Sequence, residues 1–368
     1  MKDSPKIAGI GIPFAAGIAA GAVFFPDKNV IPTIIPFCLA ALIPAMTVAT
    51  LPRIGNNRLL KIATCAIFLA TGLFCHISYS LGEGISLPQG PLGRMAERCV
   101  TTLKETIDSL PYEDKVTGGL LKALLTGDRS GLDRETTRIF RDSGASHILA
   151  LSGLHLGILY MILAKLSSPI GNTPSAKRFR FVLTIMAAGS YTVMTGASPS
   201  IVRAFLYITI GETARLSGRE RSPAGILISA LTIQLAINPG VISSLGFQLS
   251  YLAMAGIAFL YPRLENLYPK AEGLAGKLDP MRKIWSGASV SIACQAFTAP
   301  LVWYRFHTFP KYFLITNLTA LPLTSAVMVL SVATIALSFF GTCPGFMVSI
   351  NEESVRLLIR CLEIISSL

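Results

Sequence analysis

The sequence predicts an all-α fold, a polytopic integral membrane helical bundle of about ten transmembrane helices with additional amphipathic helices. Hydrophobic residues make up 52% of the 368 residues, charged residues make up only 14%, and the mean hydropathy is +0.58. Several apolar runs exceed the roughly 18 residues that a helix needs to cross a bilayer. Because lipid offers no partner to backbone polar groups, apolar runs without strand-like alternation are expected to form helices.

Ten apolar runs are the predicted spans. The first follows Lys2 and Lys6 as a signal peptide would, but it is longer than the apolar part of a signal peptide, so we expect it to remain as a helix. The last run is long enough for a short re-entrant piece and a full span. The runs cover residues 7–25, 30–50, 59–77, 145–167, 181–196, 201–215, 223–238, 241–261, 284–303 and 312–340.

The distribution of Lys and Arg predicts a multi-pass topology with a cytoplasmic N-terminus. If the N-terminus lies inside, most basic residues fall in inner segments, and the short outer segments hold only Lys28, Arg203, Arg305 and Lys311. This asymmetry is typical of membrane proteins, whose cytoplasmic loops are enriched in positive charge. We therefore interpret the net charge of +12 as mainly a topology signal, in preference to a patch that binds DNA.

The long outer segment, residues 78–144, is predicted to be helical. Apolar residues recur at helical spacing before Pro111, which indicates an amphipathic helix of about 15 residues lying on the membrane or on the bundle. A second apolar face precedes a turn at 126–128, and a charged helix begins near Asp133 and ends at Gly144, as at a glycine C-cap. The two apolar faces comprise Met95, Cys99, Leu103, Ile107 and Leu110, and then Leu120, Leu121, Leu124 and Leu125.

Four regions follow from these patterns. Residues 1–77 are predicted to form three N-terminal transmembrane helices, 78–144 the external helical segment, and 145–340 the transmembrane core. The tail, 341–368, is amphipathic, and its apolar stripe consists of Val355, Leu358, Leu362 and Ile365.

The run GASHILALSGLHLG, Gly144 to Gly157, places polar residues in an otherwise apolar stretch. In a continuous helix His147 and His155 share a side with Leu151 and Leu154, and Ser152 and His155 are close enough to touch. A histidine buried in a membrane must be hydrogen-bonded or face water. Two interpretations stay open here, a structural contact between helices and the lining of an aqueous path.

This run and three later stretches resemble the ComEC competence family. The first resemblance joins the Gly127–Asp128–Arg129 turn to Gly144–His147 and to Ala150, Ser152, Gly153 and His155. The others are TGASPSIVRA (Thr195–Ala204), NPGVISSLGFQLSYLAMAGI (Asn238–Ile257) and TAPLVWYRFHTFPKYFLITNLTALPL (Thr298–Leu323). The four stretches occur in the family's order, and the resemblance covers about residues 118–340.

The resemblance implies a channel of the bacterial inner membrane that carries single-stranded DNA into the cytoplasm during natural transformation. It implies single-stranded DNA, membrane lipids, a cytoplasmic ATPase motor and an external DNA receptor as partners, it allows a homo-oligomer, and it implies no cofactor. Only the channel domain is matched. We expect neither the family's soluble β-domain nor its metallo-β-lactamase-like domain, because 78–117 is short and helical and no HxHxDH motif occurs. The chain is therefore not expected to be an enzyme.

Several residues become candidates for the DNA path, and each has a structural alternative. Arg203 could meet phosphates or reach the membrane interface, Gln248 and Asn317 could simply bridge helices, and Asp128 could serve its turn. Aromatic residues such as Trp303 could stack on bases, although a belt at the membrane interface is preferred. The candidate residues are Asp128, Arg129, His147, Ser152, Gly153, His155, Arg203, Gln248 and Asn317.

Two other classes of function were weighed. A small-solute or lipid transporter would need an inverted repeat or an ionic site at the midplane, but no repeat is found and Glu212 is the only acid within a predicted span. An intramembrane His/Ser or metal enzyme would need a third ligand beside His147 and His155. The sequence contains no GxSxG, HExxH or CxxC motif, and its seven cysteines are scattered.

Overall fold

The computed structural model describes residues 4–24, 57–81, 91–218, 222–269, 279–307, 309–341 and 343–368. Within these residues every regular element is a helix, which confirms the predicted all-α class. The predicted span 30–50 lies outside the described residues. The chain divides into two compact units, the first formed by Met1–Leu87 and Leu206–Met254 and the second by Pro88–Phe205 and Ala255–Leu368.

Three stretches are long and apolar enough to cross a membrane, namely Gly153–Ile170, Leu245–Glu265 and Phe313–Phe339. Shorter apolar helices cover Ala8–Val23, Thr64–Ile77 and Pro223–Ile237. The full count of about ten spans therefore stays a prediction. The stretch 312–340 contains a single helix that continues through Pro322, so the suggested re-entrant piece is wrong.

Close helix packing characterises the first unit. Added Cβ atoms on Gly17 and Gly72 would lie 2.0 Å from the carbonyl oxygens of Leu69 and Phe14, respectively, so only glycine allows α1 and α3 to approach this closely. Small residues serve this purpose in membrane helix pairs. The elements of this unit are α1 (Ser4–Phe24), α3 (Asn57–Leu81), the larger part of α10 (Pro199–Leu216), α11 (Pro223–Ile237), the 3-10 helix η3 (Pro239–Ser243) and most of α12 (Leu245–Phe259).

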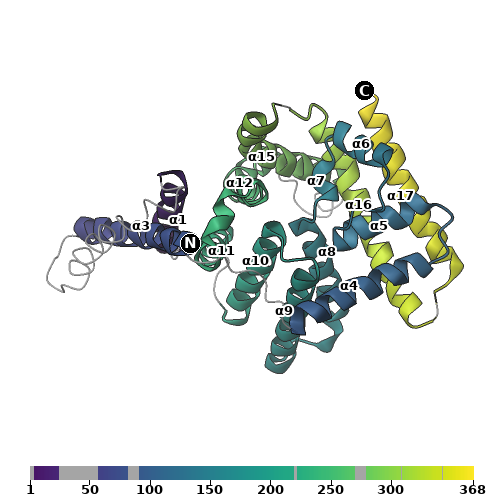
Figure 1. Ribbon diagram of the computed structural model, residues 1–368, viewed down its shortest axis with the longest axis horizontal. Helices are drawn as coiled ribbons and strands as arrows, with labels where there is room; N and C mark the ends of the chain where they lie inside the picture. Colours follow the sequence, from purple (N-terminus) through teal and green to yellow (C-terminus); the bar gives the residue numbers. More distant parts are fainter. Residues whose placement is uncertain are drawn as a thin grey trace. The chain divides into compact units, whose positions relative to one another are not determined.

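The second unit contains the remaining helices. Its α16 and α17 lie side by side, drawn in yellow-green and yellow in Figure 1, and α4, α5 and α6 pack near them. The first residues of α10 and the last of α12 also belong to it. Its own helices are α4 (Pro91–Ser109), α5 (Lys115–Thr126), α6 (Arg134–Asp142), α7 (Ser146–Leu149), α8 (Gly153–Leu166), η2 (Ser168–Ile170), α9 (Pro174–Met194), α13 (Tyr261–Glu265), α15 (Pro280–Phe306), α16 (Phe313–Phe339) and α17 (Gly345–Ser366).

Residues 91–144 fold as their sequence predicts. α4 ends two residues before Pro111, and α6 follows Asp133, whose side chain accepts a hydrogen bond from the Thr136 amide. Gly144 lies just beyond the end of α6 with φ +80°, a left-handed conformation that glycine adopts without steric cost. These boundaries confirm the helix starts and stops that were predicted in this segment.

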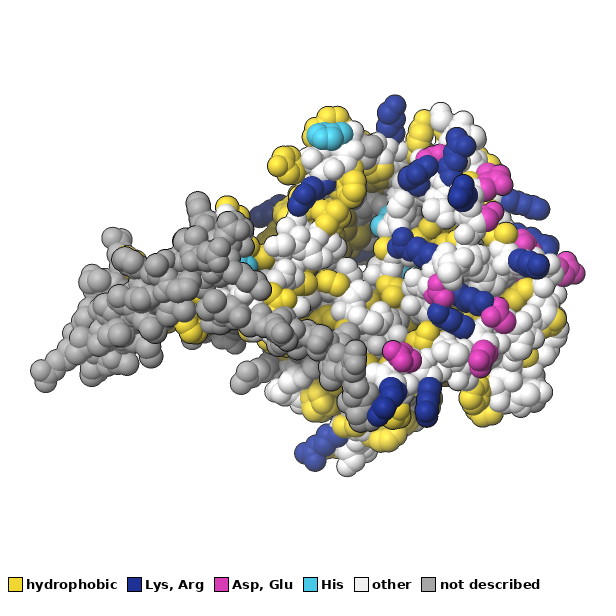
Figure 2. Space-filling view, viewed as in Figure 1, with side chains coloured by type: hydrophobic (Ala, Val, Ile, Leu, Met, Phe, Trp, Pro, Cys, Tyr) yellow, Lys and Arg dark blue, Asp and Glu magenta, His cyan; other side chains and the backbone are white. Residues whose placement is uncertain are grey.

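Apolar faces from α4, α5, α6, α7, α8, α16 and α17 form the core of the second unit. The predicted stripe of the tail is buried there, since Val355, Leu358 and Leu362 are fully buried and Ile365 nearly so. The amphipathic tail therefore packs on α16 as part of the folded unit. Figure 2 shows Lys, Arg, Asp and Glu side chains intermixed on the outer surface of this part of the molecule.

Candidate functional site

The most informative local feature of the second unit is a break between α7 and α8. Ala150 is extended, with ψ 132°, and Ser152 has φ −123° and ψ 166°, so α7 ends at Leu149 and α8 begins at Gly153. The predicted continuous helix over 145–167 is therefore wrong. The physical reason is capping, because serine stabilises a helix start better than it stabilises a helix interior.

Ser152 and His155 form a reciprocal cap at the start of α8. The Ser152 hydroxyl oxygen accepts a hydrogen bond from the Leu154 amide at 3.3 Å, and Nδ1 of His155 accepts one from the Ser152 amide at 3.1 Å. This is the geometry of a capping box with histidine in the place usually taken by Glu or Gln. The predicted contact between the two residues is confirmed, and it caps the start of α8 instead of lying along the face of a continuous helix.

His155 is buried, with 1% of its surface exposed. Because its Nδ1 accepts a hydrogen bond, the proton of the neutral ring resides on Nε2. The ring borders a cavity of about 300 Å³, whose other lining residues are apolar apart from Tyr191. The Tyr191 hydroxyl donates to the Leu125 carbonyl oxygen at 3.0 Å. His155 therefore lies between the polar residues of the break and this mostly apolar cavity.

The turn Gly127–Asp128–Arg129 packs against the same break. Gly127 has φ +80°, and an added Cβ there would lie 2.4 Å from a methyl carbon of Leu151, so this position requires glycine for conformation and for space. Nε of Arg129 donates to the carbonyl oxygen of Leu149, the last residue of α7, at 3.1 Å. Arg129 therefore binds the C-terminal end of α7, where the helix dipole favours a cation.

Asp128 holds its own turn and ties it to α4. One carboxylate oxygen accepts from the Ser130 amide at 3.0 Å, and the other forms an ion pair with Lys104. These hydrogen bonds, Lys104 first, hold the pKa of Asp128 well below its usual range. These contacts stabilise the turn. They match the structural role that was predicted for Asp128 as the alternative to a place on the DNA path.

Arg203 reaches the break from α10. Its Nη2 lies 2.8 Å from the place that a Cβ on Gly153 would occupy, so the guanidinium lies directly beside the first residue of α8. Arg203 is buried, with 9% of its surface exposed. Two arginines thus converge on the break, Arg129 at the end of α7 and Arg203 at the start of α8.

The surroundings of the break favour negative charge. The start of α8 carries the positive end of the helix dipole, and the sequence holds no Asp or Glu between Asp142 and Glu212. Within the described residues, no group of three His, Cys, Asp or Glu side chains is placed to hold a metal ion. The arrangement is chemically suited to binding an anion through guanidinium groups and backbone amides.

His147 is the second residue of α7, just after the junction with α6, and its side chain is exposed. Its Nδ1 is 3.2 Å from the Gly144 carbonyl oxygen. The junction packs on the corner between α15 and α16, because Thr316 Oγ1 donates to the Ser143 carbonyl oxygen at 2.7 Å and Gly144 lies against Pro310. His147 therefore faces outward near the break, on a different side from the buried His155.

The last two candidate residues have separate surroundings. Asn317, on α16, has a buried Oδ1 for which the described residues offer no hydrogen-bond partner. Gln248 belongs to the first unit, where its Nε2 donates to the Ile242 carbonyl oxygen at 2.8 Å and so links α12 to η3. The second unit thus brings together Asp128, Arg129, Ser152, Gly153, His155 and Arg203, and Gln248 is not one of that group.

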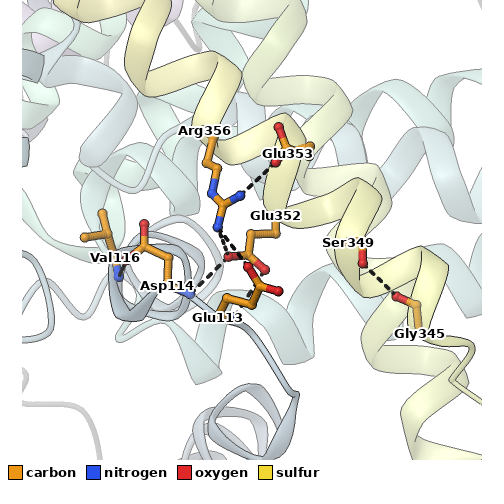
Figure 3. Close-up of polar contacts among 8 residues, drawn as sticks. All are labelled: Glu113, Asp114, Val116, Gly345, Ser349, Glu352, Glu353 and Arg356. Carbon is orange, nitrogen blue, oxygen red and sulfur yellow. Dashed lines mark hydrogen bonds and ion pairs between the residues drawn. The ribbon is translucent and has the colours of Figure 1, made fainter.

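A polar joint that the sequence did not reveal fixes α17 to the corner between α4 and α5 (Figure 3). The carboxylate of Glu352 accepts from the backbone amides of Glu113 and Asp114, at 3.2 and 3.0 Å, and pairs with Arg356 at 2.8 Å. Beside it, Asn351 donates to the Tyr112 hydroxyl at 3.0 Å, and burial raises the pKa of Tyr112 to about 12. The i, i+4 spacing of Glu352 and Arg356 was the one available signal.

The fold and site thus describe a helical protein with apolar stretches long enough to cross a membrane and a broken helix that is flanked by arginines. Comparison with protein families then identifies the group. The family model described as "Competence protein" matches residues 124–368, and the chain belongs to this family. No solved structure matches the chain.

Curated relatives agree with this assignment. ComE operon protein 3 of Bacillus subtilis is 29% identical over 52% of this chain and 23% of its own length. Recombination protein 2 of Haemophilus influenzae and competence protein ComA of Neisseria gonorrhoeae are each 26% identical over 57% of this chain, and the match covers 27% and 29% of their lengths. The chain therefore spans less than a third of each of these relatives.

Proposed function

We propose that this protein takes part in DNA uptake during natural transformation and that it forms the path of a single DNA strand across the bacterial inner membrane. Membership of the competence family and the names of the relatives support the general role. The observation that carries the finer proposal is the pair of arginines, Arg129 and Arg203, at the two ends of the break between α7 and α8.

Charge is the first reason for this assignment. A DNA strand carries one negative charge on each phosphate, so its path needs cations and neutral donors and should avoid carboxylates. The stretch from Ser143 to Gly211 contains no Asp or Glu. Guanidinium groups bind phosphate through paired hydrogen bonds, which makes arginine better suited than lysine at such a point.

The broken helix is the second reason. α8 begins the apolar stretch Gly153–Ile170, which is long enough to cross a membrane. Irregular backbone at membrane depth is tolerated where it is buried in protein or lines a watery path. Half-helices in transporters present their positive N-terminal ends to anionic groups of the cargo. In this proposal Ser152, Gly153 and His155 set that N-terminal end of α8, and His147 lies at the approach to it.

The proposal assigns the remaining tasks to partners. The sequence has no GxxxxGK[ST] motif for binding ATP, so force comes from a cytoplasmic ATPase and capture of DNA from an external receptor. The N-terminus is cytoplasmic, residues 78–144 are external, 145–340 form the channel core, and Gln248 and Asn317 contribute polar groups to it.

The test uses the native host. The gene is deleted and complemented with wild type, Arg203→Gln and Arg203→Lys, and uptake of labelled, nuclease-resistant DNA is measured beside transformation frequency. Loss of one charge-assisted hydrogen bond of roughly 1.5–3 kcal/mol should lower uptake by about tenfold or more in Arg203→Gln. Arg203→Lys should recover part of it, because the charge remains.

Arg215→Gln is the matched control, since Arg215 is an exposed arginine near the other end of α10. We expect normal uptake in that variant and equal amounts of protein in all strains. Full transformation after deletion of the gene, in a host shown to transform, would overturn the proposed function. Normal uptake in Arg203→Gln would retain the role in DNA uptake but remove Arg203 from the path.

A further inference from the structure

The corner between α15 and α16 carries a dense group of exposed aromatic side chains. Trp303, Tyr304 and Phe306 lie in the last turn of α15 and are 59%, 73% and 54% exposed, and Phe309 follows at 47%. We call residues Trp303–His307 and Phe309–Lys311 the aromatic corner. Large aromatic rings are costly to leave in water, so an exposed group of them marks an interaction surface.

The rings of this corner point in several directions. Trp303 and Phe306, three residues apart, share a side of α15, and Tyr304 lies about 100° around the helix from Trp303. The helix ends at His307, which has φ +52° and whose amide donates to the Trp303 carbonyl oxygen at 2.9 Å. Phe309 then meets Phe313 edge to face, with ring centroids 6.1 Å apart.

Cations accompany the rings. Arg305, His307 and Lys311 are all exposed within the corner. The sequence holds no Asp or Glu between Asp279 and Glu352. Around the end of α15, Figure 2 shows hydrophobic and basic side chains without acidic ones. This composition contrasts with the outer surface of α4, α6 and α17, where both signs of charge are intermixed.

The aromatic corner adjoins the broken-helix site. Pro310 lies against Gly144, and Thr316 donates to the Ser143 carbonyl oxygen, so the corner is fixed to the junction that precedes α7. His147, three residues beyond Gly144, is exposed at that junction. A strand that approaches the break can therefore contact the aromatic corner within the same compact unit.

We propose that the aromatic corner binds single-stranded DNA directly, with Trp303, Tyr304 and Phe306 stacking on bases and Arg305 and Lys311 contacting phosphates. Proteins that bind single strands without regard to sequence combine stacking rings with basic side chains in this way. The inference deepens the proposed function, since it names the surface that receives the strand next to the break.

A membrane-interface belt is the other explanation of exposed Trp and Tyr residues. A belt requires rings on the side of a helix that faces lipid. The position of the corner against the junction before α7, and the basic side chains beside the rings, favour a strand over lipid. The experiment makes the lipid explanation one of its outcomes.

Tryptophan fluorescence tests the contact directly. The chain contains two tryptophans, and Trp285 is partly enclosed, with its Nε1 donating to the Leu264 carbonyl oxygen. Purified full-length protein in lipid nanodiscs is titrated with a 20-nucleotide oligo-dT strand. We expect saturable quenching in wild type and loss of that quenching in Trp303→Phe, in which Trp285 remains as the reference.

Affinity measurements with matched variants extend the test. Trp303→Ala combined with Tyr304→Ala should weaken binding of the oligo-dT strand by about tenfold or more. Phe346→Ala is the control, because Phe346 is 65% exposed in the first turn of α17. Arg305→Gln combined with Lys311→Gln should reduce the slope of log affinity against log salt by about 0.7 for each phosphate that the protein no longer neutralises.

The inference is overturned if brominated lipids quench Trp303 while the oligo-dT strand does not, because the corner is then a membrane belt. It is also overturned if Phe346→Ala weakens DNA binding as much as the corner variants do. These failures are distinguishable from failure of the proposed function, which is decided by transformation of the deletion strain. Loss of transformation without binding at the corner would leave the proposed function intact.

Discussion

The joint around Glu352 and the site around the helix break belong to the same compact unit but treat charge in opposite ways. At the joint, Glu352 and Arg356 neutralise each other, and two backbone amides donate hydrogen bonds to the Glu352 carboxylate. At the break, Arg129 donates to the Leu149 carbonyl oxygen and Arg203 lies beside Gly153, while the one nearby carboxylate described for the turn, that of Asp128, is paired with Lys104.

The difference separates groups that hold the fold from groups that are suited to a ligand. Matched charges inside a protein satisfy each other and resist change, because removing one partner leaves the other desolvated. An excess of cations over acids favours an external anion. We therefore expect substitutions at the joint to act through stability and substitutions at Arg203 to act through DNA uptake.

The largest effect is expected at the joint. Glu352→Ala removes a carboxylate that is 4% exposed and leaves the amides of Glu113 and Asp114 without their acceptor. We expect a loss of about 2–4 kcal/mol in the free energy of unfolding. Thermal unfolding of the purified protein in detergent measures it.

Glu353→Ala is the control for this prediction. Glu353 pairs with the same Arg356, but its side chain is 63% exposed, so its removal should change stability by less than about 1 kcal/mol. Equal melting temperatures for the two variants would contradict the idea that buried pairing holds α17 in place.

A smaller effect is expected from Gly127→Ala, which tests how the turn supports the break. The new Cβ would approach Leu151 to 2.4 Å and would impose a left-handed conformation on alanine. The combined strain should cost about 1–3 kcal/mol and displace Arg129 from the end of α7. Thermal unfolding and DNA uptake of this variant measure the two consequences.

Gly118→Ala is the matched control, because the structure leaves open space around that glycine in the interior of α5. Alanine there should be neutral or slightly stabilising. The idea that Gly127 supports the break would be contradicted if Gly127→Ala melted like wild type and kept normal DNA uptake.

A third effect, about 1 kcal/mol, is expected for Ser152→Ala, which removes the hydroxyl that caps α8. Ser152→Thr keeps an oxygen at the same place and should recover most of the stability. Thermal melting of both variants is the measurement. Equal loss in Thr and Ala variants would mean that shape at the break matters more than capping.

Sequence patterns predicted elements with strong periodicity and clear end signals. The apolar spacing from Met95 to Leu110, the Asp133 cap and the stripe of α17 from Val355 to Ile365 were all readable, because each depends on neighbours along the chain. The resemblance to the competence family was also available from short motifs in order, and the family match confirms it.

The rest depends on contacts between distant segments. The break at Ala150–Ser152 was missed because the hydropathy pattern continues across it and only the capping geometry interrupts the helix. The approach of Arg203 to Gly153 and the bond from Glu352 to Glu113 join residues far apart in sequence, so spacing held no signal for them. The contact between Ser152 and His155 was predicted correctly, because the two residues are only three positions apart in the sequence.

The smallest expected effect concerns the ion pair of Asp128 with Lys104, which links the turn at the break to α4. Because folding lowers the pKa of Asp128, the pair stabilises the protein above the unfolded carboxyl pKa of about 3.9, and this stabilisation is lost as pH falls below that value. Asp128→Asn should therefore melt closer to wild type at pH 3.5 than at pH 6.

Asp108, which pairs with Lys122 at an exposed position, provides the control, and Asp108→Asn should change melting little at either pH. A constant difference between wild type and Asp128→Asn across this range would show that the carboxylate adds no stability through its charge. In that case the turn would support the break only through the packing of Gly127 and the hydrogen bond of Arg129, and not through the ion pair of Asp128.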